Sequence, residues 1–454
     1  MRRTAVIDVV GLTRSLLDRT PRLAALRKAA ADVKAITPAV TCSAQSTFLT
    51  GKLPRDHGVV ANGWYFRDTG EISLWKQSNR LVKGEKIWHL GRKRDPAFTC
   101  ANSFWWFNML TDVEWSVTPR PLYLSDGLKL PDCYSQPPEL RERFNRELGQ
   151  FPLFKFWGPA TSIECSDWIA RAAMALEESY APTLQLVYLP HLDYVLQKVG
   201  PQGDLAQDLA EIDALCGRLI DFFTGRGVRV VVLSEYGITQ TTRAVHPNRI
   251  LREAGLLQVK VDLGREYLDP GPSRAFAVAD HQLAHVYVQR PADLPAVRKL
   301  FEGVPGVEQV LDQDGKRAFG LDHERSGELV LISSADAWFT YYFWTEDARA
   351  PDYARTVAIH AKPGYDPCEL FVDPKLALPK LAIARALARK LLGFRYMMEV
   401  IPLDASLVKG SHGRITDKDE EGPLFMTTEP KLLPAGKLAS TDVCGLLLDH
   451  VFRD

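Results

Sequence analysis

The stretch VRVVVLSEYG (228–237) joins an uninterrupted apolar run to an acidic residue, Glu235, that follows it directly. Two other runs have the same form, namely TAVIDVVG (4–11) and TLQLVYLPHLD (183–193). Continuous apolar strands are typical of a mostly parallel sheet whose two faces are both covered by helices. The sequence therefore predicts an α/β fold with such a sheet.

Each of the three runs carries an acid at or near its carboxyl end: Asp8, Asp193 and Glu235. Ligands of open α/β sheets bind at the carboxyl ends of the strands. One acid after a strand is common, but three acids in equivalent places predict a shared site.

Helical patterns separate the runs, as in CSDWIARAAMALEESY (165–180), and this alternation indicates a doubly wound fold. Between residues 269 and 349 the pattern changes to short strands and one helix, which predicts a small α+β cap insertion. We expect the core to comprise residues 1–268 and 350–454 on either side of that insertion.

The composition of the chain excludes several classes of protein. The 454 residues include 56 basic and 56 acidic side chains, so no overall field recruits a nucleic acid polymer or a membrane surface. The 7 cysteines form no CxxC pair, which indicates reduced thiols and a cytoplasmic location. No apolar run approaches the ~20 residues of a membrane helix, so we expect a soluble protein of undetermined oligomeric state.

The segment AVTCSAQSTFLTG (39–51) places Thr41 at the start of a predicted helix. Helix starts offer free N–H groups and the positive end of the dipole, which favour a phosphate group. Thr41 is thus a candidate nucleophile. The alternative is an ordinary N-cap, which is the usual role of threonine at this position.

The motifs in their order resemble the alkaline phosphatase superfamily, specifically its nucleotide pyrophosphatase/phosphodiesterase-like branch. The strongest match is TPAVTCSAQSTFLTGKLPRDHGVVANGWY (37–65), and SEYG (234–237) and SHG (411–413) follow at suitable distances. The resemblance covers roughly residues 1–265 and 395–425. It implies two divalent metal ions, Zn, Mn or Mg, and a phosphorylated threonine intermediate.

Carried over position by position, the resemblance assigns Asp8, Thr41 and Glu235 to the metal site that activates the nucleophile. It assigns Asp193 and His412 to the second metal site. Asn62 matches the residue that binds a phosphate oxygen beside the backbone N–H of Thr41.

Two expected histidine ligands are missing, because Tyr236 and Gln197 occupy their positions. If these two residues serve as ligands, the site favours harder cations such as manganese, magnesium or calcium over zinc. Alternatively, another histidine replaces them, and we place His360 ahead of His191, with His246 behind. A site with one metal or a degenerate site is the third alternative.

Other histidines and aromatic residues have structural interpretations. His281 and His285 in DHQLAH are flanked by strand-like runs, so we favour a structural role for both over a helical metal pair. His57 is expected to hold a turn. Three aromatic side chains are considered as substrate contacts, although such residues usually belong to a core: Trp64, Tyr65 and Trp105.

We expect a metal-dependent hydrolase of small phosphate esters, with phosphodiesters or phosphoanhydrides favoured. Asn62 is a neutral donor, and no arginine is evidently placed to bind a dianion. The alternatives are a phosphomonoesterase, a phosphonate hydrolase or a phosphoryl transferase acting on a small metabolite. A binding protein that keeps the fold but has lost catalysis also fits the missing histidines.

Overall fold

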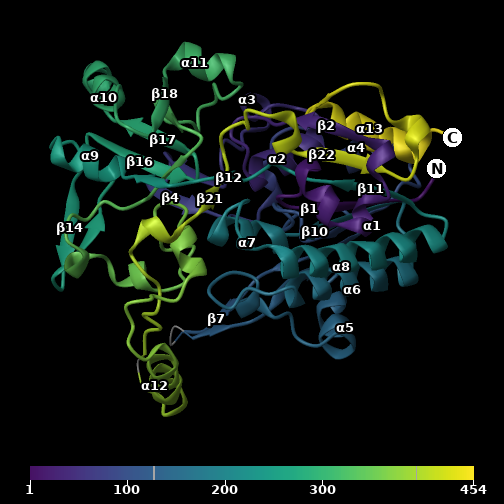
Figure 1. The fold of residues 1–454 in the computed structure, drawn as a ribbon, viewed down its shortest axis with the longest axis horizontal. Helices are drawn as coiled ribbons and strands as arrows, with labels where there is room; N and C mark the ends of the chain where they lie inside the picture. The colour runs from purple at the N-terminus through teal and green to yellow at the C-terminus, as the bar shows by residue number, and fades with distance from the viewer. Residues whose placement is uncertain (126–127, 395) are drawn as a thin grey trace.

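A nine-stranded sheet forms the centre of the molecule in the computed structural model, which describes residues 1–125, 128–394 and 396–454 (Figure 1). The strand order is β23-β2-β22-β11-β1-β10-β5-β6-β9. The bounds in chain order are β1 (Thr4–Val9), β2 (Ala30–Lys34), β5 (Cys100–Ser103), β6 (Trp115–Pro119), β9 (Cys133–Gln136), β10 (Leu184–Leu189), β11 (Arg229–Leu233), β22 (Leu424–Thr427) and β23 (Leu438–Ala439).

Strands β11, β1, β10, β5 and β6 run parallel to one another, whereas β22 and β9 are antiparallel to their neighbours. Every residue of β1, β10 and β11 is buried, as expected for strands with both faces covered. The predicted doubly wound, mostly parallel α/β fold is confirmed.

Helices cover both faces of this sheet. In Figure 1, α6 and α8 lie along one side, and α2, α4 and α13 lie on the other. The longer helices are α2 (Thr41–Thr50), α4 (Ile87–Arg94), α5 (Glu139–Glu147), α6 (Glu164–Tyr180), α7 (His191–Val199), α8 (Ala206–Gly225), α10 (Leu294–Phe301), α12 (Pro379–Leu391) and α13 (Asp442–Phe452), and the shorter ones are α1 (Pro21–Ala24), α3 (Pro54–His57), α9 (Pro247–Glu253) and α11 (Gln313–Ala318). No helix in the described ranges has both the length and the apolar character needed to cross a membrane.

A second, antiparallel sheet lies beside the first, with the strand order β16-β17-β19-β18 (Figure 1). Its strands are β16 (Ala275–Asp280), β17 (Leu283–Val288), β18 (Val307–Leu311) and β19 (Leu329–Ser333). It has its own hydrophobic cluster, which includes Phe276, Val286 and Leu331. The α+β texture predicted for this part of the chain is present.

The second cluster also includes residues outside 269–349, such as Val245, Leu251, Ile401 and Val408. Packing therefore associates the flanking segments on both sides with the insertion. We propose that the cap unit is larger than residues 269–349 and begins near Val245 and ends near Val408.

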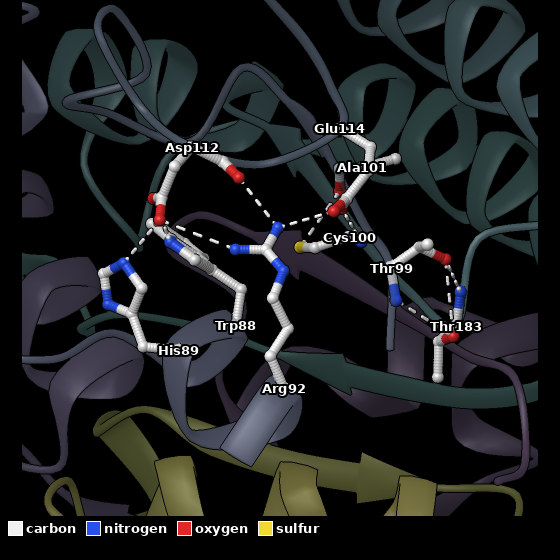
Figure 2. A network of polar contacts seen from close by, with 9 residues as sticks. All are labelled: Trp88, His89, Arg92, Thr99, Cys100, Ala101, Asp112, Glu114 and Thr183. Atoms are coloured by element: carbon white, nitrogen blue, oxygen red, sulfur yellow. Dashed lines mark hydrogen bonds and ion pairs between the residues drawn. The ribbon is translucent and has the colours of Figure 1, made fainter. Parts of the chain in front are cut away.

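The amino ends of the central strands are held by polar contacts (Figure 2). Glu114 accepts hydrogen bonds from Arg92 of α4 at 2.6 Å and from the backbone N–H of Cys100 at 2.7 Å. The hydroxyls of Thr99 and Thr183 accept from each other's backbone N–H groups at 3.1 and 3.2 Å. These hydrogen bonds satisfy polar groups at the amino edge of the sheet. The predicted acids lie at the opposite, carboxyl edge.

Candidate active site

The parallel register brings the three acids together. Strand β1 lies between β10 and β11, and Asp8 is aligned with Tyr188 and Leu233. Asp193 is in the first turn of α7, directly after β10, and Glu235 follows β11. All three carboxyl groups are buried, so the sheet places three acids in a low-dielectric environment at one edge.

Gln45 joins two of these acids. Its Nε2 donates to Asp8 at 3.1 Å and to Glu235 at 2.7 Å, and its Oε1 accepts from the backbone N–H of Trp106 at 2.7 Å. Sequence reasoning missed this residue. The sequence could have indicated Gln45, because positions 41 and 45 lie on the same face of one helix and both side chains therefore face the site.

Thr41 is the first residue of α2, and Val40 is the N-cap. Val40 forms no side-chain capping hydrogen bond, and Thr41 lies inside the helix, so the N-cap alternative for Thr41 does not describe the structure. The Oγ1 of Thr41 lies 3.0 Å from the hydroxyl of Tyr236, and that hydroxyl donates to Asp193 at 3.1 Å. Since the phenol proton goes to Asp193, Thr41 donates its proton toward Tyr236.

Asn62 lies next to the start of α2. Its Oδ1 accepts from the backbone N–H of Cys42 at 3.0 Å. Its backbone N–H and its Nδ2 donate to the buried carboxylate of Asp280 at 2.7 and 3.1 Å. Asp280, which sequence reasoning did not identify, thereby orients the predicted phosphate-binding amide. An amide nitrogen has two N–H bonds, so Nδ2 keeps a second donor.

The predicted histidine His412 lies in the cluster. Its Nδ1 is 2.8 Å from the carbonyl oxygen of Ala39, and because a carbonyl only accepts, the proton is on Nδ1. The Nε2 lone pair therefore remains available, 3.7 Å from Asp193. The imidazole stacks on the ring of Tyr236 at a centroid distance of 3.7 Å.

His281 is the second histidine of the cluster, contrary to its structural interpretation from the sequence. It occupies the turn between β16 and β17 with a φ of 60°, and its ring centroid is 3.7 Å from that of His412. The structural interpretation does describe His285, which bonds the carbonyl of Val60 at 3.1 Å and accepts from the N–H of Gly327 at 3.2 Å. DHQLAH is a hairpin, so its two histidines have different environments.

Gln197 and Tyr236 take the places of the missing histidines within this cluster. Gln197 donates to Asp193 at 2.7 Å and accepts from Tyr365 at 2.9 Å. Tyr365 also stacks on His281 at 3.7 Å. The amide of Gln197 and the phenol of Tyr236 both donate to Asp193 and therefore orient it.

The other predicted replacement histidines lie elsewhere. His360 is exposed. The Nε2 of His191 is 3.2 Å from Asp208 and 3.4 Å from Glu211, both on α8. His246 contacts Thr340 at 2.7 Å. The described contacts join none of the three to the acid cluster: His191 and His246 contact other residues, and His360 is exposed.

Four further side chains singled out from the sequence are buried in the structure. His57 holds the turn after α3, with one nitrogen 3.0 Å from Thr47 and the other accepting from Val59 at 3.1 Å. The aromatic residues considered as substrate contacts are all buried: Trp64, Tyr65 and Trp105.

Burial dominates the electrostatics of the cluster. It raises the pKa of Asp8, Asp193 and Asp280 to about 7 each. Burial, followed by the neighbouring Asp8, raises the pKa of Glu235 well above its ordinary value. In the described ranges, no lysine or arginine forms an ion pair with any of these four acids.

Burial also lowers the pKa of His412 to about 3 and that of His281 well below its ordinary value. Both imidazoles are therefore neutral at physiological pH, which is the form that binds metals.

The cluster fits divalent cations. Four buried atoms of the cluster lack a hydrogen-bond partner among the described residues: Asp8 Oδ1, Glu235 Oε2, His281 Nδ1 and His412 Nε2. Buried polar groups are normally satisfied, so a group of orphaned carboxylate oxygens and imidazole nitrogens matches a metal-ligand set.

Comparisons with known proteins identify the family of this chain. The chain matches the family model for Type I phosphodiesterase / nucleotide pyrophosphatase over residues 4–366. An uncharacterised pyrophosphatase/phosphodiesterase of Schizosaccharomyces pombe is 26% identical over 253 residues, which are 52% of this chain and 45% of that protein. The match thus spans less than half the length of that curated relative.

Solved structures share the fold. Phosphonoacetate hydrolase from Sinorhizobium meliloti, in complex with phosphonoacetate, has a TM-score of 0.62 at 16% identity, with 99% of this chain and 96% of that chain covered. An inactive variant of murine ectonucleotide pyrophosphatase / phosphodiesterase 5, in complex with AMP, has a TM-score of 0.59 at 14% identity, with 99% and 95% covered. The chain belongs to the type I phosphodiesterase/nucleotide pyrophosphatase family of the alkaline phosphatase superfamily.

Proposed function

We propose that this protein hydrolyses small phosphodiesters or phosphoanhydrides through a phosphorylated Thr41 and depends on divalent cations. One observation carries the proposal: Thr41 begins a helix beside four buried acids, and no lysine or arginine in the described part of the chain forms an ion pair with them. Such a concentration of buried negative charge requires protons or cations.

We assign Asp8, Thr41 and Glu235 to one cation. Asp193, His412 and His281 form the second set, in which His281 takes the replacement role that the sequence had given to His360. Bound cations at these positions activate an alcohol nucleophile and stabilise the leaving oxygen. Because oxygen atoms dominate the first set, it favours manganese or magnesium over zinc.

The chain's own residues perform the remaining tasks. The Thr41 oxygen attacks phosphorus while the bond to the leaving group breaks; the Thr41 proton is released to water, and the leaving oxygen takes up a proton from water. The second N–H bond of the Asn62 amide and the start of α2 bind the phosphate oxygens. Water then hydrolyses the phosphothreonine and restores the hydroxyl.

Charge supports a substrate with one negative charge at the reacting phosphate. Lys362 is buried and already pairs with Asp366 at 2.8 Å and with Glu369 at 2.7 Å. Asn62 is neutral and is itself bound to Asp280. A phosphomonoester dianion would lack an arginine partner, so a diester or anhydride is favoured.

The test compares bis-4-nitrophenyl phosphate, 4-nitrophenyl phosphate and ATP as substrates of the manganese-loaded protein. Thr41→Ala is expected to reduce kcat by about a thousandfold or more, since it removes the nucleophile. Ser46→Ala is the matched control, because it deletes a buried hydroxyl of the same helix. Mass spectrometry of the acid-quenched wild type should find a phosphoryl group on the peptide that contains Thr41.

Near wild-type turnover by Thr41→Ala would disprove the threonine mechanism. Binding of these phosphates without any turnover by the metal-loaded wild type would instead identify a binding protein.

A further inference from the structure

Helix α12 exposes an apolar face to solvent. Leu381 is 62% exposed, Leu387 44% and Leu391 86%, and Leu392 just after the helix is 73% exposed. Scattered exposed leucines are normal on protein surfaces, but a continuous set on one helix marks an interaction site.

The exposed residues share one face. Positions 381, 384, 388, 391 and 392 follow a spacing of three and four residues, which forms a stripe along a helix, and all five are exposed. The opposite face packs on the protein, since Ala386 is buried and Ile383 contacts the second hydrophobic cluster. The helix is therefore docked by one face and apolar on the other.

The charge around this stripe has one sign. Residues 374–398 contain no aspartate or glutamate, although the whole chain has equal numbers of acidic and basic residues. Lys380 and Arg385 are exposed next to the stripe. The basic residues of this segment are Lys375, Lys380, Arg385, Arg389, Lys390 and Arg395.

We propose that the outer face of α12 docks on the surface of an anionic lipid bilayer. An apolar stripe bordered by lysine and arginine is the pattern of an interfacial helix, whose leucines enter the acyl boundary while the cations meet lipid phosphates. Figure 1 places α12 at a tip of the molecule, away from the nine-stranded sheet, where it can reach a planar surface. With 13 residues it lies on the bilayer and does not cross it.

The charges select this partner. The lysine and arginine side chains complement negatively charged lipid headgroups. With a neutral bilayer, only burial of the leucine side chains would contribute to the binding free energy. A second copy of this chain would instead bring two basic segments together, and their repulsion disfavours that contact.

The experiment is co-sedimentation of the full chain with phosphatidylcholine vesicles, with and without phosphatidylserine. The wild type is expected to bind the anionic vesicles preferentially and to dissociate as salt increases. The double variant Leu391→Glu with Leu392→Glu should reduce binding at least tenfold. Lys380→Glu with Arg385→Glu should abolish the preference for phosphatidylserine.

The matched control is Leu110→Glu with Leu263→Glu, which adds the same two charges at exposed leucines outside α12. It should bind vesicles as the wild type does. Melting temperature and turnover of a soluble substrate show that each variant is folded. Absent vesicle binding by the wild type, or an equal loss in the control, overturns the proposal. A wild-type dimer that the α12 variant dissociates would assign the face to self-association and would also overturn it.

Discussion

Asp8→Asn is expected to stabilise the metal-stripped protein above neutral pH, although it removes a proposed metal ligand. Burial raises the pKa of Asp8 to about 7 in the folded protein, from an ordinary value of 3.8. Between these values the folded state holds a proton that the unfolded state has released. The contribution of the Asp8 proton to the free energy of unfolding is therefore fully present below the unfolded pKa and is lost as the pH rises through about 7.

The magnitude follows from the shift. A difference of roughly three pKa units corresponds to about 4 kcal/mol at about 1.4 kcal/mol per unit, of which about 3 kcal/mol is lost between pH 5 and pH 8. Asparagine has the same shape and does not titrate. Its oxygen can accept from Gln45 and its amide can donate to Glu235, so the variant avoids this loss.

The assay is urea unfolding of chelator-treated wild type and variant at pH 5 and pH 8. The variant is expected to gain stability relative to the wild type as the pH rises. The difference between their free energies of unfolding should be about 3 kcal/mol larger at pH 8 than at pH 5. Manganese provides the control, because it should stabilise the wild type strongly and the variant weakly. An equal difference at both pH values, or equal stabilisation by manganese, would refute the reasoning.

Three further predictions concern the site and the core. Tyr236→Phe removes the hydroxyl between Thr41 and Asp193, and kcat should fall about tenfold or more while elemental analysis finds an unchanged metal count. His281→Ala should weaken metal affinity roughly 10–100-fold by equilibrium dialysis, whereas the exposed His360→Ala should not; the reverse order would restore the replacement role of His360. Leu186→Ala, in the fully buried centre of β10, should lower the free energy of unfolding by about 2–5 kcal/mol in urea titrations, and a loss below about 1 kcal/mol would contradict its place in the core.

Much of the site was predictable from local sequence. Asp8 and Glu235 follow apolar runs, and a parallel sheet brings the carboxyl ends of its strands to one edge, so their convergence required no knowledge of long-range packing. Thr41 and Asn62 belong to one short segment that shapes the start of α2. The same local signals identified the texture change that marks the second sheet.

The sequence by itself determined the doubly wound core, because strand and helix periods are set by neighbouring residues. Only the tertiary structure decided that His281, and none of His360, His191 and His246, meets His412. His281 lies in a hairpin turn whose place depends on how the second sheet packs against the first, and its φ of 60° aims its ring there. Asp280 reaches Asn62 across 218 residues for the same reason: contacts between separately formed units depend on how their surfaces fit, which no local pattern records.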